Sequence, residues 1–339
     1  MIKKSFSFSS AAVNYLFNAD FSYIADLVPK ERAVIVTDEN VFDKHRKKFK
    51  GFRSIVIKAG EQFKIQSTVD TIIQQLIDLG ADRNTTLIGV GGGVVTDITG
   101  YVAGVFMRGI KCGFVPTSIL AMVDAAIGGK NGIDVGLYKN MVGLIRQPDF
   151  ILYDFTMLKS LPKEEWVNGF AEVIKHACIK DLAMFKLLEE NKLATFQKDL
   201  TALAKLVQRN ALLKTKVVVE DEFEKGERKL LNFGHTIGHA VENLYKIPHG
   251  HAVSIGMGAA CKISEQITGF KQSERVTNVL KQYGLPPQFE FDKEETFRIL
   301  KSDKKKDNQA INYVLLDKIG KGTIVSLPFT QIQEIINAL

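Results

Sequence analysis

Residues 85–97 read Thr-Thr-Leu-Ile-Gly-Val-Gly-Gly-Gly-Val-Val-Thr-Asp, an apolar run that ends in glycines. The run at 85–90 predicts a buried strand, and the glycines predict a tight turn into a helix. Such a turn lets the backbone approach a pyrophosphate, which then rests at the helix N-terminus. The spacing is not that of the common GxGxxG fingerprint, because Val94 or Thr96 stands where the third glycine or alanine belongs. A turn that needs small residues only for packing explains this stretch equally well.

The segments before this turn alternate between strand and helix patterns. Residues 33–37 and 54–57 are short apolar runs, typical of buried strands. Between residues 67 and 80 apolar side chains recur at helical spacing, and the pattern stops at Gly80. Strands that alternate with helices predict a parallel sheet covered on both faces, which is a Rossmann-like α/β layer.

The pattern changes after about residue 158. Leu161 and Pro162 precede acidic residues in a predicted helix start, and the chain then reads as successive helices to about residue 303. A break falls at residues 284–287, and residues 311–316 and 323–327 predict a late hairpin. We therefore predict an α/β domain over residues 1–158 and a mainly helical domain over 159–339. The cleft between two such domains is the expected site.

Composition limits the class of protein. The 339 residues are 45% hydrophobic and 24% charged, as in ordinary soluble globular proteins. No apolar run reaches the roughly 18 residues of a membrane span, and the N-terminus has no apolar secretory region. The three cysteines are far apart in sequence, which favours buried thiols in a reducing cytoplasm over a disulfide framework.

The basic charge favours an anionic partner. The formal net charge is +7 and the pI is about 9.1, which is compatible with nucleic acid, anionic lipid or a small anionic substrate. Lysines and arginines are spread along the chain, however, and the main run, residues 304–306, is typical of a solvated loop. Several cations stand alone inside glycine-rich or apolar stretches, which favours a small anionic substrate over nucleic acid.

One such stretch follows the glycine turn. Asp124 ends a mostly apolar helical segment, an unusual place for a carboxylate. Lys130 follows two glycines, so its ammonium group and the nearby N–H groups could hold an anion. Lys139 and Asn140 form a second polar pair, and Arg108 lies at the end of the preceding predicted helix. Cations that alternate with glycine suggest recognition of phosphate or carboxylate.

Histidines indicate a metal site. Four of the six lie between residues 235 and 251, and Glu172, Lys175 and His176 share a face of another predicted helix. Imidazole is the commonest protein metal ligand, and a catalytic zinc ion takes three protein ligands with one open position. A single histidine is usually structural, but four in one short stretch favour a metal site. Spacing alone does not choose among one carboxylate and five histidines.

These motifs together resemble the 3-dehydroquinate synthase family of the shikimate pathway. They occur in order over most of the chain and are jointly specific. They occupy residues 59–64, 91–103, 107–109, 115–132, 139–140, 171–176, 232–242 and 249–253. The resemblance implies an N-terminal NAD-binding α/β domain and a C-terminal helical metal-binding domain.

The resemblance also implies roles for individual residues. Zn²⁺ or Co²⁺ would be held by Glu172, His235 and His251, while His176 and His249 would lie outside the ligand set. NAD would contact Asp38, Asn40, Glu61, Lys64, Gly92, Gly93, Val94, Asp97, Thr117, Ser118, Asp124, Lys130, Lys139, Ser160, Leu161 and Glu165. The sugar phosphate would meet Asp124, Lys130, Lys139, Asn140, Lys175, Lys214, Arg228, Asn232, His239 and one of Lys304 and Lys305. Arg108 would reach the site of a neighbouring subunit, which implies a homodimer.

Three positions depart from the family pattern. Ser118 and Ser160 stand where threonines are usual, which keeps the hydroxyl group. Tyr138 stands where glycine usually precedes the Lys139–Asn140 pair, and it could reshape the loop that presents them.

The activity implied is the conversion of 3-deoxy-D-arabino-heptulosonate 7-phosphate to 3-dehydroquinate and phosphate, a phosphate-eliminating lyase reaction. It would proceed by transient oxidation with NAD, elimination, re-reduction and aldol closure. Three alternatives remain at this point: a related cyclase acting on another sugar phosphate, a metal-dependent alcohol or glycerol dehydrogenase, and a basic nucleic-acid-binding protein. Lys214 and Arg228 suit a substrate carboxylate, and the many lysines do not suit uncharged glycerol.

Overall fold

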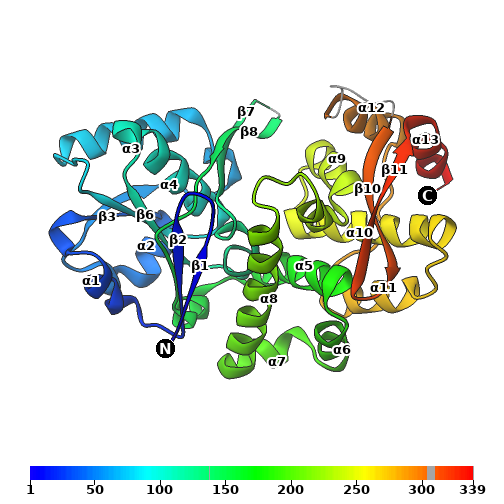
Figure 1. Cartoon of the computed structure of the whole chain (residues 1–339), viewed down its shortest axis with the longest axis horizontal. Coiled ribbons are helices and arrows are strands. Elements are labelled where there is room, and N and C mark those ends of the chain that lie inside the picture. Colours follow the sequence, from blue (N-terminus) through cyan, green and yellow to red (C-terminus); the bar gives the residue numbers. More distant parts are fainter. Residues whose placement is uncertain (137, 304–309, 339) are drawn as a thin grey trace. The chain divides into compact units, whose positions relative to one another are not determined.

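The computed structural model describes residues 1–136, 138–303 and 310–338. It divides into two compact units. The first unit comprises Met1–Glu165 and Val207–Phe223, and the second comprises Trp166–Leu206 and Glu224–Leu339. Figure 1 shows the first unit mainly in blue to green and the second mainly in green to red.

The first unit contains a seven-stranded sheet with the order β1-β2-β9-β6-β5-β3-β4. Only the β1–β2 pair is antiparallel, and the other neighbours are parallel. A parallel sheet needs covered faces, because each crossover places a helix on it. The strands are β1 (Ile2–Ser7), β2 (Ala12–Phe17), β3 (Ala33–Asp38), β4 (Arg53–Ile57), β5 (Thr86–Gly91), β6 (Lys111–Pro116) and β9 (Phe150–Tyr153).

Alternate residues of β3 enter two separate cores, one on each face of the sheet. Val34 and Val36 of β3 pack with α3 (Gln66–Asp78) and α4 (Gly93–Val105) on one face. Ala33 and Ile35 pack on the other face, where α1 (Ile24–Leu27) and α2 (Glu39–His45) lie. This alternation follows from the two-residue period of a strand. The predicted strands at 33–37, 54–57 and 85–90 are thereby confirmed.

Shorter elements complete the first unit. The hairpin of β7 (Lys130–Val135) and β8 (Tyr138–Ile145) forms its own antiparallel pair. Helical turns are η1 (Phe21–Tyr23), η2 (Lys30–Arg32), η3 (Arg46–Phe49), η4 (Glu61–Phe63), η5 (Phe106–Arg108), η6 (Ala121–Ala125) and η7 (Phe155–Ser160). Asp124 lies inside the π-helical turn η6, one residue before its end, rather than after a helix.

The second unit is mainly helical, as predicted. The helices described from Lys163 onward are α5 (Lys163–Lys180), α6 (Leu182–Glu190), α7 (Leu193–Lys198), α8 (Leu200–Glu220), α9 (His235–Tyr245), α10 (His249–Ile267), α11 (Ser273–Gln282), α12 (Lys293–Asp303) and α13 (Phe329–Ala338), with the turn η8 (Glu227–Asn232). From Val207 onward, α8 belongs to the first unit. The predicted hairpin is confirmed as β10 (Ala310–Lys318) and β11 (Lys321–Pro328), beside α10 in Figure 1.

Glycines allow α9 and α10 to pack closely. A Cβ atom at Gly238 would lie 2.8 Å from the carbonyl oxygen of Ala252, and one at Gly256 would collide with the carbonyl of Gly234. Gly234 itself has φ 81°, a left-handed conformation at the start of α9 that glycine adopts without strain. This close packing matters because both helices begin with a histidine.

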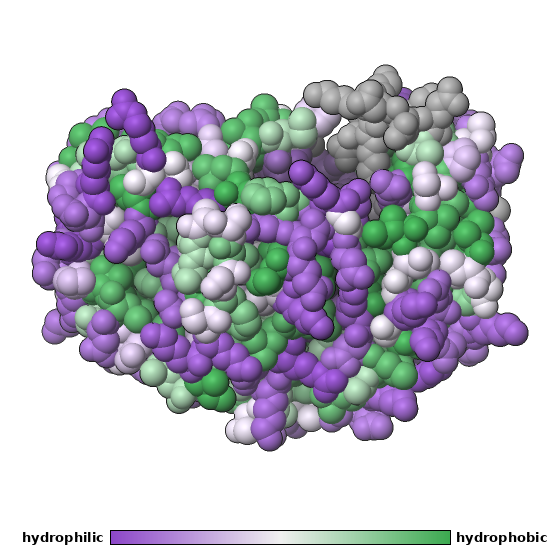
Figure 2. All heavy atoms as spheres, in the orientation of Figure 1, coloured by the Kyte–Doolittle hydropathy of each residue, from purple (hydrophilic) through white to green (hydrophobic). Residues whose placement is uncertain are grey.

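The described helices include none long and apolar enough to cross a membrane. Figure 2 shows hydrophilic side chains, in purple, across much of the visible face, with hydrophobic ones in smaller groups. All three cysteines are buried and free, as predicted.

Candidate metal centre and cofactor-binding residues

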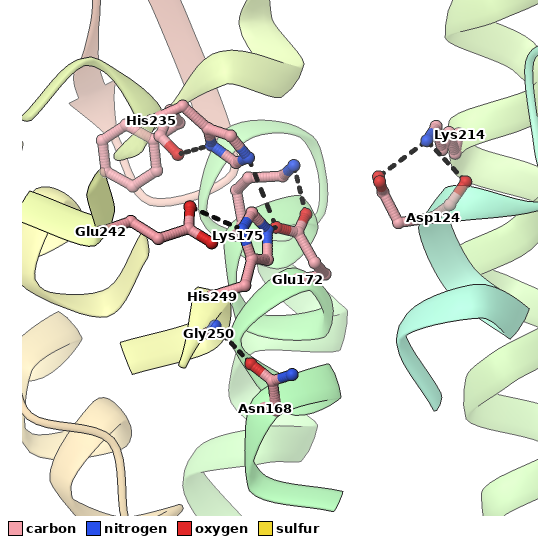
Figure 3. A network of polar contacts seen from close by, with 10 residues as sticks. Asp124, Asn168, Glu172, Lys175, Lys214, His235, Glu242, His249 and Gly250 are labelled. Atoms are coloured by element: carbon pink, nitrogen blue, oxygen red, sulfur yellow. Dashed lines mark hydrogen bonds and ion pairs between the residues drawn. The ribbon is translucent and has the colours of Figure 1, made fainter. Parts of the chain in front are cut away.

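Three potential metal ligands converge in the second unit. Glu172 lies in α5, and His235 and His249 are the first residues of α9 and α10. One ligand atom from each lies within 4.8 Å of the others, and Figure 3 shows the three side chains turned toward one another. Glu172 Oε1 lies 3.5 Å from His235 Nε2 and 3.3 Å from His249 Nε2.

These distances fit a tetrahedral zinc site. Ligand atoms at about 2.0–2.1 Å from zinc at tetrahedral angles lie roughly 3.3 Å from one another. One carboxylate and two imidazoles are also a known donor set of catalytic zinc sites. The residues therefore fit the group, with a position left for a water molecule or substrate.

Hydrogen bonds orient both imidazoles for metal binding. His235 Nδ1 lies 3.1 Å from the carbonyl oxygen of Phe233, so this nitrogen donates its proton. His249 Nδ1 lies 3.3 Å from Oε2 of the buried Glu242. In each case the Nε2 lone pair is left for a metal, the arrangement that outer hydrogen-bond partners produce in metal sites. Sequence reasoning missed the role of Glu242.

The titration of the two histidines follows their surroundings. Burial, followed by the charge of Lys175, lowers the pKa of His235 well below its usual value. Burial also acts to lower the pKa of His249, but hydrogen bonds and charge from Glu172 and Glu242 raise it to about 10. The carboxylates of Glu172 and Glu242 thus favour a positive charge between them.

His251 lies outside this group, although the resemblance implied it as a ligand. Among the described residues, it shares no cluster of ligand atoms with Glu172 or His235. His249 and His251 are two residues apart in α10, and side chains at that spacing point to different sides of a helix. Burial lowers the pKa of His251.

The start of α10 is held in place from α5. The backbone N–H of Gly250 donates to the side chain of Asn168, and a Cβ atom at position 250 would collide with the Asn168 carbonyl. Lys175 is buried one helical turn after Glu172 and forms an ion pair with it. α5 therefore supplies a ligand, an ionic partner for that ligand and the anchor of the neighbouring histidine helix.

Other predicted substrate residues lie on the same unit. His239 is one turn after His235, with a ring-centroid distance of 5.0 Å. Asn232 Nδ2 donates to Glu224 Oε1 over 2.6 Å, and Arg228 is 2% exposed in η8. Lys304 and Lys305 fall outside the described residues.

A second polar cluster lies in the first unit. Lys64, only 4% exposed, donates to Asp97 Oδ2 over 2.5 Å and to Asn140 Oδ1 over 2.7 Å. Lys139 Nζ lies 3.9 Å from Glu61 Oε1. Each of these five residues was predicted to bind NAD or the substrate, and here they lie together.

Asp134 organises this cluster but was not among the predicted site residues. Its backbone N–H donates to the Lys64 carbonyl over 2.8 Å, and its carboxylate accepts the Asn140 N–H over 2.7 Å. Asn140 has φ 54° inside β8, where the pairing register with β7 shifts between Ile133 and Val135, so the strand bulges at this point. The spacing between residues 64 and 134 held no signal for this contact.

The glycine turn has the geometry predicted from its sequence. β5 ends at Gly91 and α4 begins at Gly93, with Thr117 N–H donating to the Gly91 carbonyl over 2.9 Å. A Cβ at Gly92 would lie 3.5 Å from Ser118 Oγ. Val94 is in the first turn of α4. The turn therefore offers backbone N–H groups at a helix N-terminus, as phosphate binding requires.

Asp38 and Ser160 contact opposite ends of α2, Asp38 as its N-cap and Ser160 through the last residue of the helix, His45. Asp38 caps the helix by accepting the Val41 N–H over 3.0 Å, and burial raises its pKa. Asn40 is in the first turn. At the far end, His45 Nε2 lies 2.7 Å from Ser160 Oγ. Leu161 and Glu165 follow Ser160 in the chain, so this contact ties α2 to a segment predicted to bind NAD.

Asp124 and Lys214 form an ion pair. Lys214 Nζ donates to both the side-chain Oδ1 and the backbone oxygen of Asp124, each over 2.7 Å (Figure 3). Lys130, at the start of β7, and Arg108, in η5, are exposed. Both Met107 and Arg108 have positive φ values, 49° and 68°, which non-glycine residues rarely adopt.

The chain matches two family models. Residues 54–168 match the 3-dehydroquinate synthase N-terminal model, and residues 169–306 match the C-terminal model. The chain is 39% identical to a protein named 3-dehydroquinate synthase from Pyrococcus abyssi over 287 residues, which cover 84% of this chain and 85% of that protein. One of the same name from Thermoanaerobacter pseudethanolicus is 35% identical, with 95% and 96% covered.

Solved structures of two sugar-phosphate cyclases are also similar. A 2-deoxy-scyllo-inosose synthase complexed with carbaglucose-6-phosphate, NAD⁺ and Co²⁺ superposes with a TM-score of 0.87 at 25% identity, covering 99% of this chain and 100% of that one. A 2-epi-5-epi-valiolone synthase from Streptomyces hygroscopicus with NAD⁺ and Zn²⁺ bound gives 0.88 at 25% identity, with 99% and 98% covered.

Proposed function

The chain belongs to the 3-dehydroquinate synthase family, and from that membership we propose that it converts 3-deoxy-D-arabino-heptulosonate 7-phosphate to 3-dehydroquinate and phosphate. The reaction is a step of the shikimate pathway toward chorismate and the aromatic amino acids. The observation that carries the proposal is the identity of 35–39% to relatives of this name over most of the chain, against 25% to cyclases with other names. We assign it to the phosphate-eliminating lyases and to the cytoplasm.

The proposed cofactors are NAD⁺ and one divalent metal ion, Zn²⁺ or Co²⁺, which both similar cyclase structures contain with NAD⁺. When bound, NAD⁺ accepts and later returns a hydride, while the metal polarises the hydroxyl that is oxidised. No net NADH forms. We assign NAD⁺ to residues 1–158 and the metal to residues 159–339.

The ligand set that we propose is Glu172, His235 and His249. His249 replaces the His251 of our earlier expectation, because its Nε2 lies 3.3 Å from Glu172 and its Nδ1 is held by Glu242. Lys175 is the ionic partner of Glu172, so it can hold the carboxylate in place. His239, at 5.0 Å from the His235 ring, is suited to proton transfer near the metal.

The cations of the first unit would bind the charged ends of the substrate. Lys130 is exposed and Lys139 is half-buried, and ammonium groups at such positions suit phosphate and carboxylate groups. Lys214, which is ion-paired with Asp124, and Arg228 are also assigned to the anionic groups of the substrate. Lys64 and Asp97, with Glu61, remain assigned to NAD⁺. One of Lys304 and Lys305 would complete the phosphate contacts.

We also propose a homodimer in which Arg108 enters the partner's site. Arg108 is exposed, its φ is 68°, and it makes no hydrogen bond or ion pair with residues inside the described ranges. A strained turn that presents an unused cation is typical of a functional position. Val105 and Met107 beside it are 41% and 42% exposed, which suits burial in an interface.

The test is phosphate release from 3-deoxy-D-arabino-heptulosonate 7-phosphate, with absorbance at the NADH wavelength followed in the same cuvette. We expect release that needs both NAD⁺ and metal, stops with a chelator and gives no net NADH. Net NADH would indicate a dehydrogenase. No release from folded, metal-loaded protein would contradict the proposal, and sedoheptulose 7-phosphate would then test for a related cyclase.

A further inference from the structure

A basic hollow lies on the first unit, and none of its lining residues belongs to the polar cluster around Lys64. It has a volume of about 870 Å³ and is lined by residues 42–50, 52 and 54. These residues form the end of α2, the turn η3 and the start of β4, which is the last strand of the sheet. Nothing in the proposed reaction uses them. We call this feature the basic hollow.

The charge of the basic hollow is strongly one-sided. Five of its lining residues are lysine or arginine, against a single acidic residue, Asp43. Lys48 is neutralised within the unit, because its Nζ lies 2.7 Å from Asp154 and 3.3 Å from Asp20. The other four are exposed and make no ion pair inside the described ranges. They are Lys44, Arg46, Lys47 and Lys50.

The helix dipole does not explain why four exposed cations lie so close together in residues 44–50. A cation is favourable within the last turn of a helix, which accounts for Lys44 at the end of α2. Lys47 and Lys50 lie beyond that helix, in and after the short turn η3. Like charges at such short spacing repel one another, so an anion bound among them would lower the energy of the folded protein.

Aromatic rings give the basic hollow a fixed wall. Phe42 stacks on Phe49 with ring centroids 5.7 Å apart and planes 13° apart. Phe49 is 4% exposed and belongs to the core on this face of the sheet, whereas Phe42 is half-buried with Arg46 above it at 5.8 Å. Phe49 therefore covers one face of the Phe42 ring and Arg46 lies over the same ring, so the basic hollow offers a ligand its cationic groups on a rigid aromatic support.

We propose that the basic hollow binds a small organic polyanion, one that carries two or more phosphate or carboxylate groups. The exposed cations all come from one seven-residue stretch, 44–50. Nucleic acid is generally bound by cations spread along an extended face, because several backbone phosphates must be met at once. A compact ligand fits the short stretch better.

The contact between His45 and Ser160 connects the basic hollow to the cofactor residues. His45 lines the hollow, and its Nε2 lies 2.7 Å from Ser160 Oγ. α2 runs from His45 back to its cap, Asp38. A polyanion bound to residues 44–50 would thus contact the C-terminal end of α2. Asp38 caps the other end of this helix, and its last residue, His45, contacts Ser160. This consequence rests on the proposed function, which assigns both residues to NAD⁺. We infer that polyanion binding changes NAD⁺ affinity.

Binding is tested first, by calorimetry on full-length protein loaded with metal and saturated with NAD⁺. Fructose 1,6-bisphosphate probes for phosphate ligands and benzene-1,3-dicarboxylate for carboxylate ligands. The test variant is Lys47→Gln/Lys50→Gln, and the matched control is Lys186→Gln/Lys281→Gln, which removes the same charge from exposed lysines elsewhere. We expect at least one probe to bind wild type and control equally and the test variant at least tenfold more weakly.

Absence of binding by both probes, or an equal loss in both variants, would overturn the basic hollow as a site. Coupling is then measured as the NAD⁺ dissociation constant with and without the bound probe. We expect a change of about fivefold or more, the lower range of allosteric coupling, which disappears in the test variant. An unchanged constant would overturn the coupling alone. Phosphate release by the test variant without probe reports separately on the proposed function.

Discussion

His249 Nε2 lies 3.3 Å from Oε1 of Glu172, although 77 residues separate them in the chain. The other ring nitrogen of His249 faces Glu242 at 3.3 Å. The imidazole is therefore held between two buried carboxylates, one of which can share a metal ion with it while the other fixes its orientation. Four predictions follow from this and related contacts.

Replacement of single side chains tests whether His249 or His251 is a metal ligand. We expect Glu172→Gln and His249→Ala to lose bound zinc and phosphate-release activity together, because each removes a donor from a three-ligand set. His251→Ala should retain zinc, since its side chain leaves α10 in a different direction. Metal content by mass spectrometry and circular dichroism for folding provide the measurements. Zinc loss from His251→Ala but not from His249→Ala would restore the ligand set implied by the resemblance.

Glu242→Gln should weaken the metal site without removing a ligand. The carboxylate at His249 Nδ1 makes the imidazole more basic and fixes its tautomer, and loss of such a partner typically costs about 10–100-fold in metal affinity or activity. Zinc affinity is measured by competition with a chromogenic chelator. Glu265→Gln, an exposed position in α10, is the control. Equal zinc affinities of Glu242→Gln and wild type would mean that Glu242 serves packing alone.

Lys64→Met should destabilise the first unit. Removing one partner of a buried ion pair typically costs about 3–5 kcal/mol, and we expect a loss at or below the lower end of that range because the Asp97 side chain is 16% exposed. Burial already raises the pKa of Asp97 to about 6 against the opposing effect of Lys64, so losing Lys64 raises it further. The decrease in the free energy of unfolding that Lys64→Met causes, measured with urea, should therefore be smaller at pH 5, where Asp97 is protonated, than at pH 8.

The double variant Lys64→Met/Asp97→Asn is the control for this pair. It removes both charges, so it should be more stable than Lys64→Met at pH 8 and should lose the pH dependence. If Lys64→Met lowered the free energy of unfolding equally at pH 5 and pH 8, the unpaired charge of Asp97 would not be the cause of the destabilisation.

His45 should make stability fall in mild acid. Burial, followed by the charge of Lys48, lowers the pKa of His45 below its usual 6.5. The unfolded chain therefore binds more protons in the interval below pH 6.5, and the stability contributed above that pH is lost as the pH falls. We expect the free energy of unfolding to decrease more from pH 7.5 to pH 5 in wild type than in His45→Gln.

Nuclear magnetic resonance titration provides an independent reading, with His45→Gln identifying the signal. A midpoint at or above pH 6.5 would contradict the prediction. Lys48→Met should move the midpoint upward, because it removes a neighbouring positive charge.

Local sequence patterns were sufficient for part of the fold, because they predicted β3, β4, β5 and the late hairpin but not β1, β2, β6, β7, β8 or β9. The apolar run and glycines at 85–97 determine a strand, a tight turn and a helix, because burial period and glycine conformation act within a few residues. The same locality explains why the late hairpin was predicted correctly. The crowding of histidines also indicated a metal site from sequence alone.

The set of metal ligands that we propose depends on tertiary packing. His249 and His251 are almost equivalent as sequence neighbours, but only His249 faces Glu172, because α9 and α10 pack through glycines and Asn168 holds Gly250. Contacts such as His45 with Ser160 join residues 115 positions apart. Chain chemistry thus determines which groups are available, while the packing of distant helices and strands decides which of them meet, since side-chain direction is set by the rotation of a helix against its neighbour.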